Sequence, residues 1–231
     1  MNGFMSKTKQ NIYGLERGKV GNRVAVVLDG QQVYKGLYAP SNPRTEKQQR
    51  HRAKLAFANR LSAALAEAVN VGYAMVPEEG SMQSARNAFV KANWDNGSLV
   101  WDGERGEWTL DAGRLLVAQG PLATGQGFGA RVARGWLRIT CADNELGARH
   151  AAEDDELMVA AYWPEAQGLV LYRGPQRVDC AECAFELPKE AEGVPVVWVW
   201  FRAARFHRGT VGKATLRPGQ CSASIGLETG N

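Results

Sequence analysis

The run Val196–Phe201 restricts the fold of this 231-residue chain more than any other segment. Side chains alternate between the two faces of a strand, and in this run both alternating sets are apolar. A strand of this kind has both of its faces covered. We expect one face to lie in the core and the other, which carries Trp198 and Trp200, to be covered from within the same chain. A second copy of the chain or a partner protein is the alternative cover.

Short β-rich runs separated by turn residues continue from Trp94 to the end of the chain. Seven runs have the composition of strands: residues 115–118, 135–141, 157–163, 168–172, 177–187, 194–201 and 210–216. About seven short strands with turns between them are typical of a β-sandwich of immunoglobulin-like architecture. We therefore predict that residues 96–231 form a single β-sandwich body.

A hairpin signal lies near the N-terminus. Asp29 and Gly30 separate two β-rich runs, Arg23–Leu28 and Gln31–Tyr38. Both residue types tolerate the positive φ angles of a type I′ turn. We predict a β-hairpin over these two runs.

A first helix is predicted after the hairpin, ending at about Val69. Its start is capped either by Asn42 with Pro43 behind it or by Thr45 with Gln48 three residues later. Apolar residues recur at helical spacing in its later turns, so we expect that face to be buried.

A second helix is predicted from about Glu78 to Asn93, because acidic residues in the first turn suit the helix dipole. The hairpin and the two helices together form a predicted head, residues 1–95. The predicted fold class is therefore α+β, with a basic head followed by the sandwich body.

Positive charge is concentrated in the first 60 residues. They hold twelve Lys or Arg and three acidic residues, a net charge of +9, whereas the rest of the chain carries −5. His51 falls in a basic stripe at helical spacing on the first helix. The residues predicted to make contacts are Lys19, Arg23, Lys35, Arg44, Lys47, Arg50, Arg52 and Lys54. Such a surface suits nucleic acid or an acidic protein face, and a solvated basic surface is the alternative.

The four cysteines are too few for a disulfide scaffold, so we predict ordinary thiols. Cys180 and Cys183 have the spacing of zinc ligands, but zinc requires two more donors. Cys141 and Cys221 complete such a site only if distant strands bring them together. A zinc site and an adventitious disulfide stay as alternatives.

No recognisable catalytic constellation is present. There is no Gly-x-Ser-x-Gly elbow and no His-Glu-x-x-His helix, and the three histidines fall in different predicted elements. Gly125–Gly129 is followed by β-rich sequence instead of a helix, so we interpret it as a flexible inter-strand loop. We interpret the acidic run His150–Glu156 as a solvated loop, with a divalent-cation site as the alternative. We expect no enzyme activity and no cofactor.

The N-terminus is not followed by the apolar run of a secretory signal, and no stretch approaches the ~20 apolar residues of a membrane span. We expect a chain that is cytoplasmic at synthesis and has no membrane partner.

Several segments share a pattern with a known family. In the first half these are Gly18–Asn22, Asn42–Glu46 with Gln48, Gln49, Arg52 and Lys54, Asn70–Tyr73, and Ser84–Ala88. In the second half they are Gly120–Leu122, Asp155–Tyr162 and Arg177–Gly193. Through them the whole chain resembles a family of unknown function common in Bacteroidetes, the family numbered 6266 among domains of unknown function. The resemblance implies no established activity, and the N-terminal motif is similar to sequences from phages and related elements.

These observations lead to two functional hypotheses. The first is a non-catalytic structural or interaction protein that binds a partner protein or forms a homo-oligomer, as in a larger assembly of the phage or mobile-element type. The alternative is a nucleic-acid-binding protein that uses the basic head without regard to sequence.

Overall fold

The computed structural model of the chain is described in stretches. They comprise residues 6–8, 17–28, 31–37, 44–74, 84–148, 150–190, 192–204, 207–208, 215–216 and 220–230. By internal contacts the chain divides into two compact units, Met1–Glu46 and Lys47–Asn231. Each unit is described by itself.

The first unit contains a four-stranded antiparallel sheet in the order β1-β4-β3-β2. Its strands are β1 Ser6–Thr8, β2 Gly18–Val20, β3 Arg23–Leu28 and β4 Gln31–Gly36. The predicted hairpin is confirmed, because β3 pairs with β4 from Arg23 opposite Gly36 to Leu28 opposite Gln31. Its Asp29-Gly30 turn lies outside the described residues, and the pairing of β1 and β2 with the hairpin was not predicted.

Three α-helices follow within the described residues. They are α1 Glu46–Ala64, α2 Ala66–Gly72 and α3 Ala85–Asn93. The first predicted helix is in fact two, because the backbone leaves helical geometry at Leu65, with φ −96° and ψ 18°. The start of α1 directly follows Thr45, as the second of the two predicted caps requires, whereas Asn42 and Pro43 lie outside the described residues.

The start predicted for the second helix is wrong. Ser84 has extended backbone geometry and its Oγ accepts a hydrogen bond from the Asn87 N–H over 3.2 Å. A serine that caps a helix in this way marks its first turn, so α3 begins at Ala85. The acidic residues expected in the first turn lie in 75–83, outside the described residues.

Two four-stranded sheets form the body of the second unit, in the orders β10-β9-β12-β15 and β11-β8-β7-β16. The strands are β7 Gln126–Ala133, β8 Trp136–Asp143, β9 Glu156–Trp163, β10 Gly168–Gln176, β11 Glu182–Glu186, β12 Val196–Arg202, β15 Ile225–Leu227 and β16 Thr229–Gly230. Adjacent strands are antiparallel except β16, which runs parallel to β7. Two small hairpins pair β5 Leu99–Asp102 with β6 Glu107–Leu110 and β13 His207–Arg208 with β14 Thr215–Leu216.

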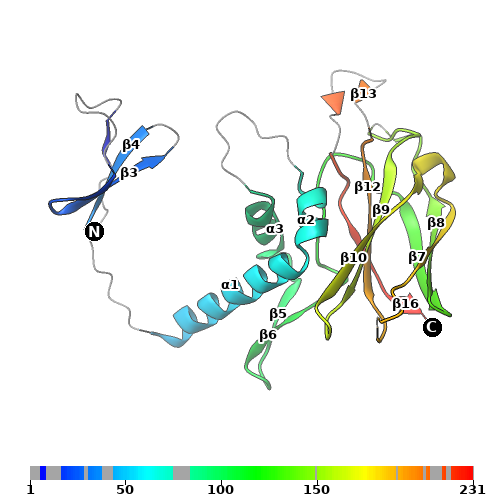
Figure 1. Ribbon diagram of the computed structural model, residues 1–231, viewed down its shortest axis with the longest axis horizontal. Helices are drawn as coiled ribbons and strands as arrows, with labels where there is room; N and C mark the ends of the chain where they lie inside the picture. The colour runs from blue at the N-terminus through cyan, green and yellow to red at the C-terminus, as the bar shows by residue number, and fades with distance from the viewer. Residues whose placement is uncertain are drawn as a thin grey trace. The chain divides into compact units, whose positions relative to one another are not determined.

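The sheet that contains β9 and β12 is the middle layer of three. Its one face shares a core with the second sheet, built from residues such as Val159, Val199 and Ile139. Its other face carries Trp198 and Trp200 into a second core formed with the helices. Figure 1 shows α1, α2 and α3 on one side of β10, β9 and β12, and β7 and β8 on the other. The predicted internal covering of the two tryptophans is confirmed.

Two of the predicted strands are wrong in whole or in part. Leu115–Ala118 is a buried irregular segment, and the Oγ of Ser224 accepts from the N–H groups of Val117 and Ala118 over 2.8 and 3.3 Å. The run predicted over 177–187 begins with a 3₁₀ turn, η1 Arg177–Asp179, and only β11 is a strand. For the run predicted over 210–216, residues 209–214 lie outside the described residues.

Strands also occur where none was predicted. The hairpin β5–β6 and the strand β7 fall between the predicted runs. Residues 126–129 belong to β7, so the interpretation of this glycine-rich segment as an inter-strand loop is wrong. Glycine lowers strand propensity, which hides such a strand in the sequence.

The predicted α+β class, with an N-terminal hairpin and a sandwich of two facing sheets, is confirmed. By contacts, however, the helices from Lys47 onward group with the sheets, not with the N-terminal hairpin, whereas the predicted boundary follows residue 95. No helix within the described residues is both long and apolar enough to cross a membrane.

Candidate functional site

The eight basic residues predicted to make contacts are shared between the two units. Lys19, Arg23, Lys35 and Arg44 belong to the first unit, and all four are exposed. The other four lie in the first turns of α1, in the second unit. The structure therefore does not define one surface that contains all eight.

Lys54 is held inside the second unit. Its Nζ lies 4.7 Å from the ring centroid of Trp94 and 5.1 Å from that of Trp108. The same Nζ donates to the Trp94 carbonyl and lies 3.9 Å from a carboxylate oxygen of Asp95. The side chain is only 15% exposed. These cation–π and polar contacts occupy Lys54 within the unit.

Arg50 contacts the hairpin β5–β6. Its guanidinium carbon lies 5.1 Å from the ring centroid of Trp101, and its carbonyl accepts from the Nε1 of Trp108 over 3.2 Å. Trp101 and Trp108 pack edge to face across the two strands, with centroids 5.5 Å apart. The N-terminal half of α1 and the hairpin therefore hold one another in place through aromatic and cationic contacts.

The residues between β5 and β6 are suited to a tight turn. The Oδ1 of Asp102 accepts from the N–H groups of Glu104 and Arg105, and Gly106 adopts a φ of 66°, which glycine reaches without strain. The turn fixes the register in which Trp101 lies opposite Trp108.

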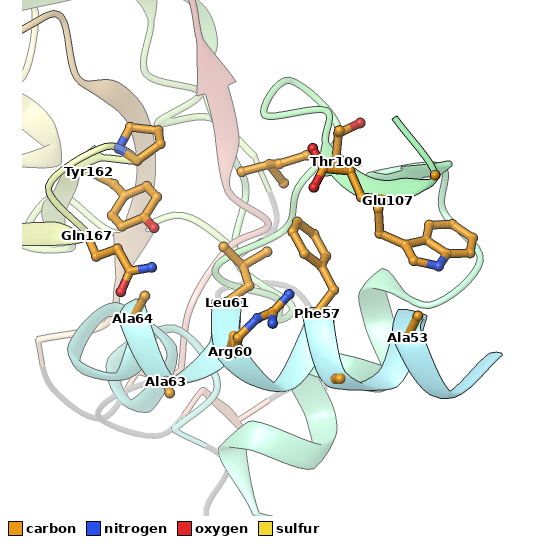
Figure 2. A pocket seen from close by; sticks show the side chains of 15 residues that line it. Ala53, Phe57, Arg60, Leu61, Ala63, Ala64, Glu107, Thr109, Tyr162 and Gln167 are labelled. Carbon is orange, nitrogen blue, oxygen red and sulfur yellow. The ribbon is translucent and has the colours of Figure 1, made fainter. Parts of the chain in front are cut away.

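A groove of about 1010 Å³ lies beside this cluster. Its floor is a face of α1, one wall is the hairpin segment 106–110, and the other is Tyr162 with the β9–β10 turn. Figure 2 shows Phe57 and Leu61 rising from α1 between Thr109 on one side and Tyr162 on the other. Three elements far apart in the sequence therefore form the groove.

The lining of the groove is mainly apolar. Small alanines of α1 alternate with Phe57 and Leu61, so a bound chain can approach the helix closely. The charged lining residues are Arg60 on α1 and Glu107 on the hairpin wall, and neither forms an ion pair with any other described residue. No serine, cysteine or histidine is found among the lining residues.

Comparison with protein families identifies the chain. A family model described as a family of unknown function, DUF6266, matches residues 15–204. The chain belongs to the DUF6266 family. No curated protein and no solved structure matches it. The match confirms the family predicted from the sequence, while the attribution to Bacteroidetes stays a prediction.

The family match covers the basic half of α1, the hairpin β5–β6 and all the residues that line the groove. One of the motifs in this range, Asn70–Tyr73, connects the helices to the irregular segment at Leu116. The hydroxyl of Tyr73 and the side-chain amide of Asn93 both donate to the Leu116 carbonyl, over 2.9 and 2.8 Å. In this DUF6266 protein the helices are thus fixed to the body by buried polar contacts as well as by the core.

The cysteines divide between the two cores of this DUF6266 protein and form no disulfide with one another. Cys141 and Cys180 lie in the core between the sheets, where the Cys141 Sγ donates to the Asp143 carbonyl over 3.3 Å, and Cys183 lies in the neighbouring strand β11. Cys221 lies in the other core, where its Sγ donates to the Val71 carbonyl over 3.4 Å. In the described part of the chain, no three His, Cys, Asp or Glu side chains converge as metal ligands.

Burial governs the acidity of these thiols. Loss of hydration raises the pKa of Cys180 to about 12, that of Cys183 to about 11 and that of Cys221 to about 12. A thiol with so high a pKa is not a thiolate near neutral pH, and the thiolate is the form that reacts and binds metal.

The interpretation of His150–Glu156 as a solvated loop is wrong at Asp155. This carboxylate is fully buried, and its Oδ2 accepts from the Nε of Arg177 over 3.0 Å. Arg177, which the sequence reasoning did not single out, also donates to the carbonyls of Asn144 and Ala123 over 2.7 and 2.8 Å. Its guanidinium carbon lies 3.7 Å from the ring centroid of Phe201. The pair holds three loops against the core and has a structural role.

Proposed function

We propose that this DUF6266 protein is a non-catalytic interaction protein that binds a segment of a partner protein in the groove between α1, β6 and the β9–β10 turn. The observation that carries the proposal is the groove itself, about 1010 Å³ in volume, with a mainly apolar lining and one charged lining residue of each sign.

The composition of the groove favours a protein partner. Protein interfaces combine an apolar centre with a polar rim. Phe57 and Leu61 provide such a centre here, while Arg60, Glu107 and Gln167 provide polar groups around it. The opposite charges of Arg60 on α1 and Glu107 on the hairpin wall also select the direction of a bound chain, since each attracts the opposite sign.

A larger assembly of the phage or mobile-element type is proposed from the similarity of the N-terminal motif to sequences from phages and related elements. In such an assembly, a second copy of this chain is one possible binding partner. Sedimentation of the full chain over a range of concentrations measures this self-association directly.

The experiment uses random twelve-residue peptides displayed on a surface and selected on the full chain. We expect selected peptides to bind at least tenfold more weakly to the variant Ala56→Trp, because the indole fills the groove. The matched control is Ala66→Trp, which adds the same side chain at an exposed alanine of α2 outside the groove. Peptides that bind both variants like the unmodified chain would show that the groove is not the binding site.

A second candidate function is nucleic-acid binding through the start of α1. Lys47, Arg50 and Arg52 are exposed on this helix, and Arg50 lies beside Trp101 and Trp108. Basic groups next to aromatic side chains suit a single-stranded nucleic acid, whose bases stack on aromatic rings. Lys54 is excluded from this role, because its ammonium group is held between two indoles.

The test measures binding of labelled single- and double-stranded DNA and RNA to the full chain at low and moderate salt. The function requires an affinity that falls with salt and with the triple change Lys47→Glu, Arg50→Glu and Arg52→Glu. The control is a triple change in the body, Arg131→Glu, Arg134→Glu and Arg138→Glu, which alters the net charge equally. Equal losses in both variants would indicate only general charge attraction.

A further inference from the structure

Among the strands of the described residues, none pairs with the outer edge of β6. In the sheet order, β6 pairs with β5 alone. The Asp111 N–H donates to the Ser98 carbonyl over 2.8 Å, which makes Ser98 and Asp111 a hydrogen-bonded pair of the antiparallel ladder. Such pairs alternate along the strands with pairs whose main-chain groups point outward. Leu110, next to Asp111, and Trp108 are therefore the residues of β6 whose N–H and C=O groups point away from β5.

These outward groups have no hydrogen-bond partner within the described part of the chain. No backbone bond between separate elements reaches Trp108 or Leu110, and neither residue has a side chain bonded to its main-chain groups. An unpaired strand edge is a template for another extended chain.

The groove runs along this same edge. Five consecutive residues, 106–110, line it. Successive residues of a strand point to opposite faces, so a groove against one face would be lined only by alternate residues. Contact with all five places the groove beside the edge of β6, where both faces meet. Figure 2 shows this segment, with Glu107 and Thr109 labelled, facing the groove above Phe57 of α1.

We propose that an extended segment of a partner protein binds in the groove as a third strand of the β5–β6 sheet, hydrogen-bonded to the main chain of Trp108 and Leu110. This inference rests on the proposed function and gives it a binding mode, β-strand addition. Main-chain bonds supply affinity in this mode, and the surrounding side chains select the sequence.

The residues that line the groove define the chemistry of the bound segment. A strand of four residues such as β6 spans about 13 Å at the usual rise of ~3.3 Å per residue, so the paired part of the segment is about four residues long. Apolar side chains at alternate positions face Phe57 and Leu61. A basic residue suits Glu107 and an acidic residue suits Arg60, and neither of these groups forms an ion pair among the described residues.

Amide hydrogen exchange on the full chain tests the binding mode, with the peptides selected from the random library as probes. In the unbound chain we expect fast exchange at Trp108 and Leu110 and slow exchange at Thr109, whose N–H points to β5. A bound peptide should slow exchange at Trp108 and Leu110 at least tenfold and leave Thr109 nearly unchanged.

A single-atom change provides the second test. Replacement of Leu110 by its α-hydroxy acid turns the outward N–H into an ester oxygen and keeps the side chain. We expect this change to weaken peptide binding about tenfold. The matched control is the same replacement at Leu99, the residue opposite Leu110, whose N–H points to the other edge of the hairpin.

The outcomes separate this inference from the proposed function. Peptides that lose affinity for Ala56→Trp but bind the Leu110 ester normally, without slower exchange at Trp108 and Leu110, would overturn strand addition and leave the groove as the binding site. A library that yields no peptide sensitive to Ala56→Trp would overturn both. Slower exchange at the two outward amides together with the weakened ester supports both.

Discussion

The Nε of Arg177 donates to the Oδ2 of Asp155 over 3.0 Å, and neither side chain is exposed to solvent. Burial lowers the pKa of the Arg177 guanidinium, while the Asp155 carboxylate opposes this decrease. Two more donors of Arg177, one on each terminal nitrogen, bond to carbonyls of two other loops. Removing one partner of such a pair is strongly destabilising, because the other partner is left as a buried charge without its counter-ion.

The variant Arg177→Met should lower the free energy of unfolding by about 3–5 kcal/mol, because it leaves Asp155 buried without its cation. Arg138→Met is the matched control. Arg138 also lies 3.0 Å from a carboxylate, that of Glu182, but both side chains are 59% exposed, so the loss should stay below about 1 kcal/mol. Urea unfolding at neutral pH measures both. Similar losses in the two variants would show that burial does not set the strength of the Arg177 pair.

The ammonium group of Lys54 should contribute to stability through the two indoles beside it. Lys54→Met keeps most of the aliphatic stem but removes the charge, and we expect a loss of about 1–2 kcal/mol in urea unfolding. Lys47→Met, an exposed position in the same helix, should change stability by less than about 0.5 kcal/mol. A neutral result at Lys54 would mean that the contacts with Trp94 and Trp108 only offset its desolvation.

Local patterns in the sequence predicted the parts of the fold that depend on local geometry. The alternation in Val196–Phe201 correctly placed β12 between two covered faces, because the period of side chains along a strand is fixed by the backbone. Leu115–Ala118 was misread because an apolar run of four residues is equally compatible with a strand and a buried loop. What decides between them is the Ser224 hydroxyl, more than 100 residues away in the chain.

The candidate site could not be predicted from one sequence for a similar reason. The basic residues of α1 were visible, but the partners of Arg50 and Lys54 are tryptophans from later elements. The groove requires α1, β6 and the β9–β10 turn to lie side by side, and no local pattern encodes that arrangement. Alternation in 107–110 would at most have predicted a strand, not its unpaired edge.

Gly72 should be required for the close contact between α2 and the irregular segment. A Cβ at this position would collide with the carbonyl oxygen of Val117 and with Ala118. Alanine is the better helix former by about 1 kcal/mol, yet we expect Gly72→Ala to lower stability by about 1–3 kcal/mol, because backbone must move. Gly168→Ala, where no atom lies within 4 Å of the added Cβ, is the control. Thermal unfolding compares them, and a stabilised Gly72→Ala would show that the segment can shift without cost.

The buried thiols should make the protein sensitive to alkaline pH. The pKa of each is about 9.0 without burial, and burial raises it to about 12 for Cys180 and Cys221 and to about 11 for Cys183. The folded state therefore holds its thiol protons more tightly than the unfolded state, and the unfolded state binds fewer protons above pH 9.0. Because the slope of stability with pH follows the difference in bound protons, the contribution of these thiols to the free energy of unfolding is constant below about pH 9.0 and falls as the pH rises toward 11–12. Urea midpoints measured from pH 8 to about pH 11 should show this decrease.

The double variant Cys180→Ala and Cys221→Ala is the control. It is less stable at every pH because of the cavities, but the slope of its stability with pH should be shallower. An unchanged slope in that variant would assign the alkaline loss to other groups, among them Tyr73, whose pKa is also raised by burial.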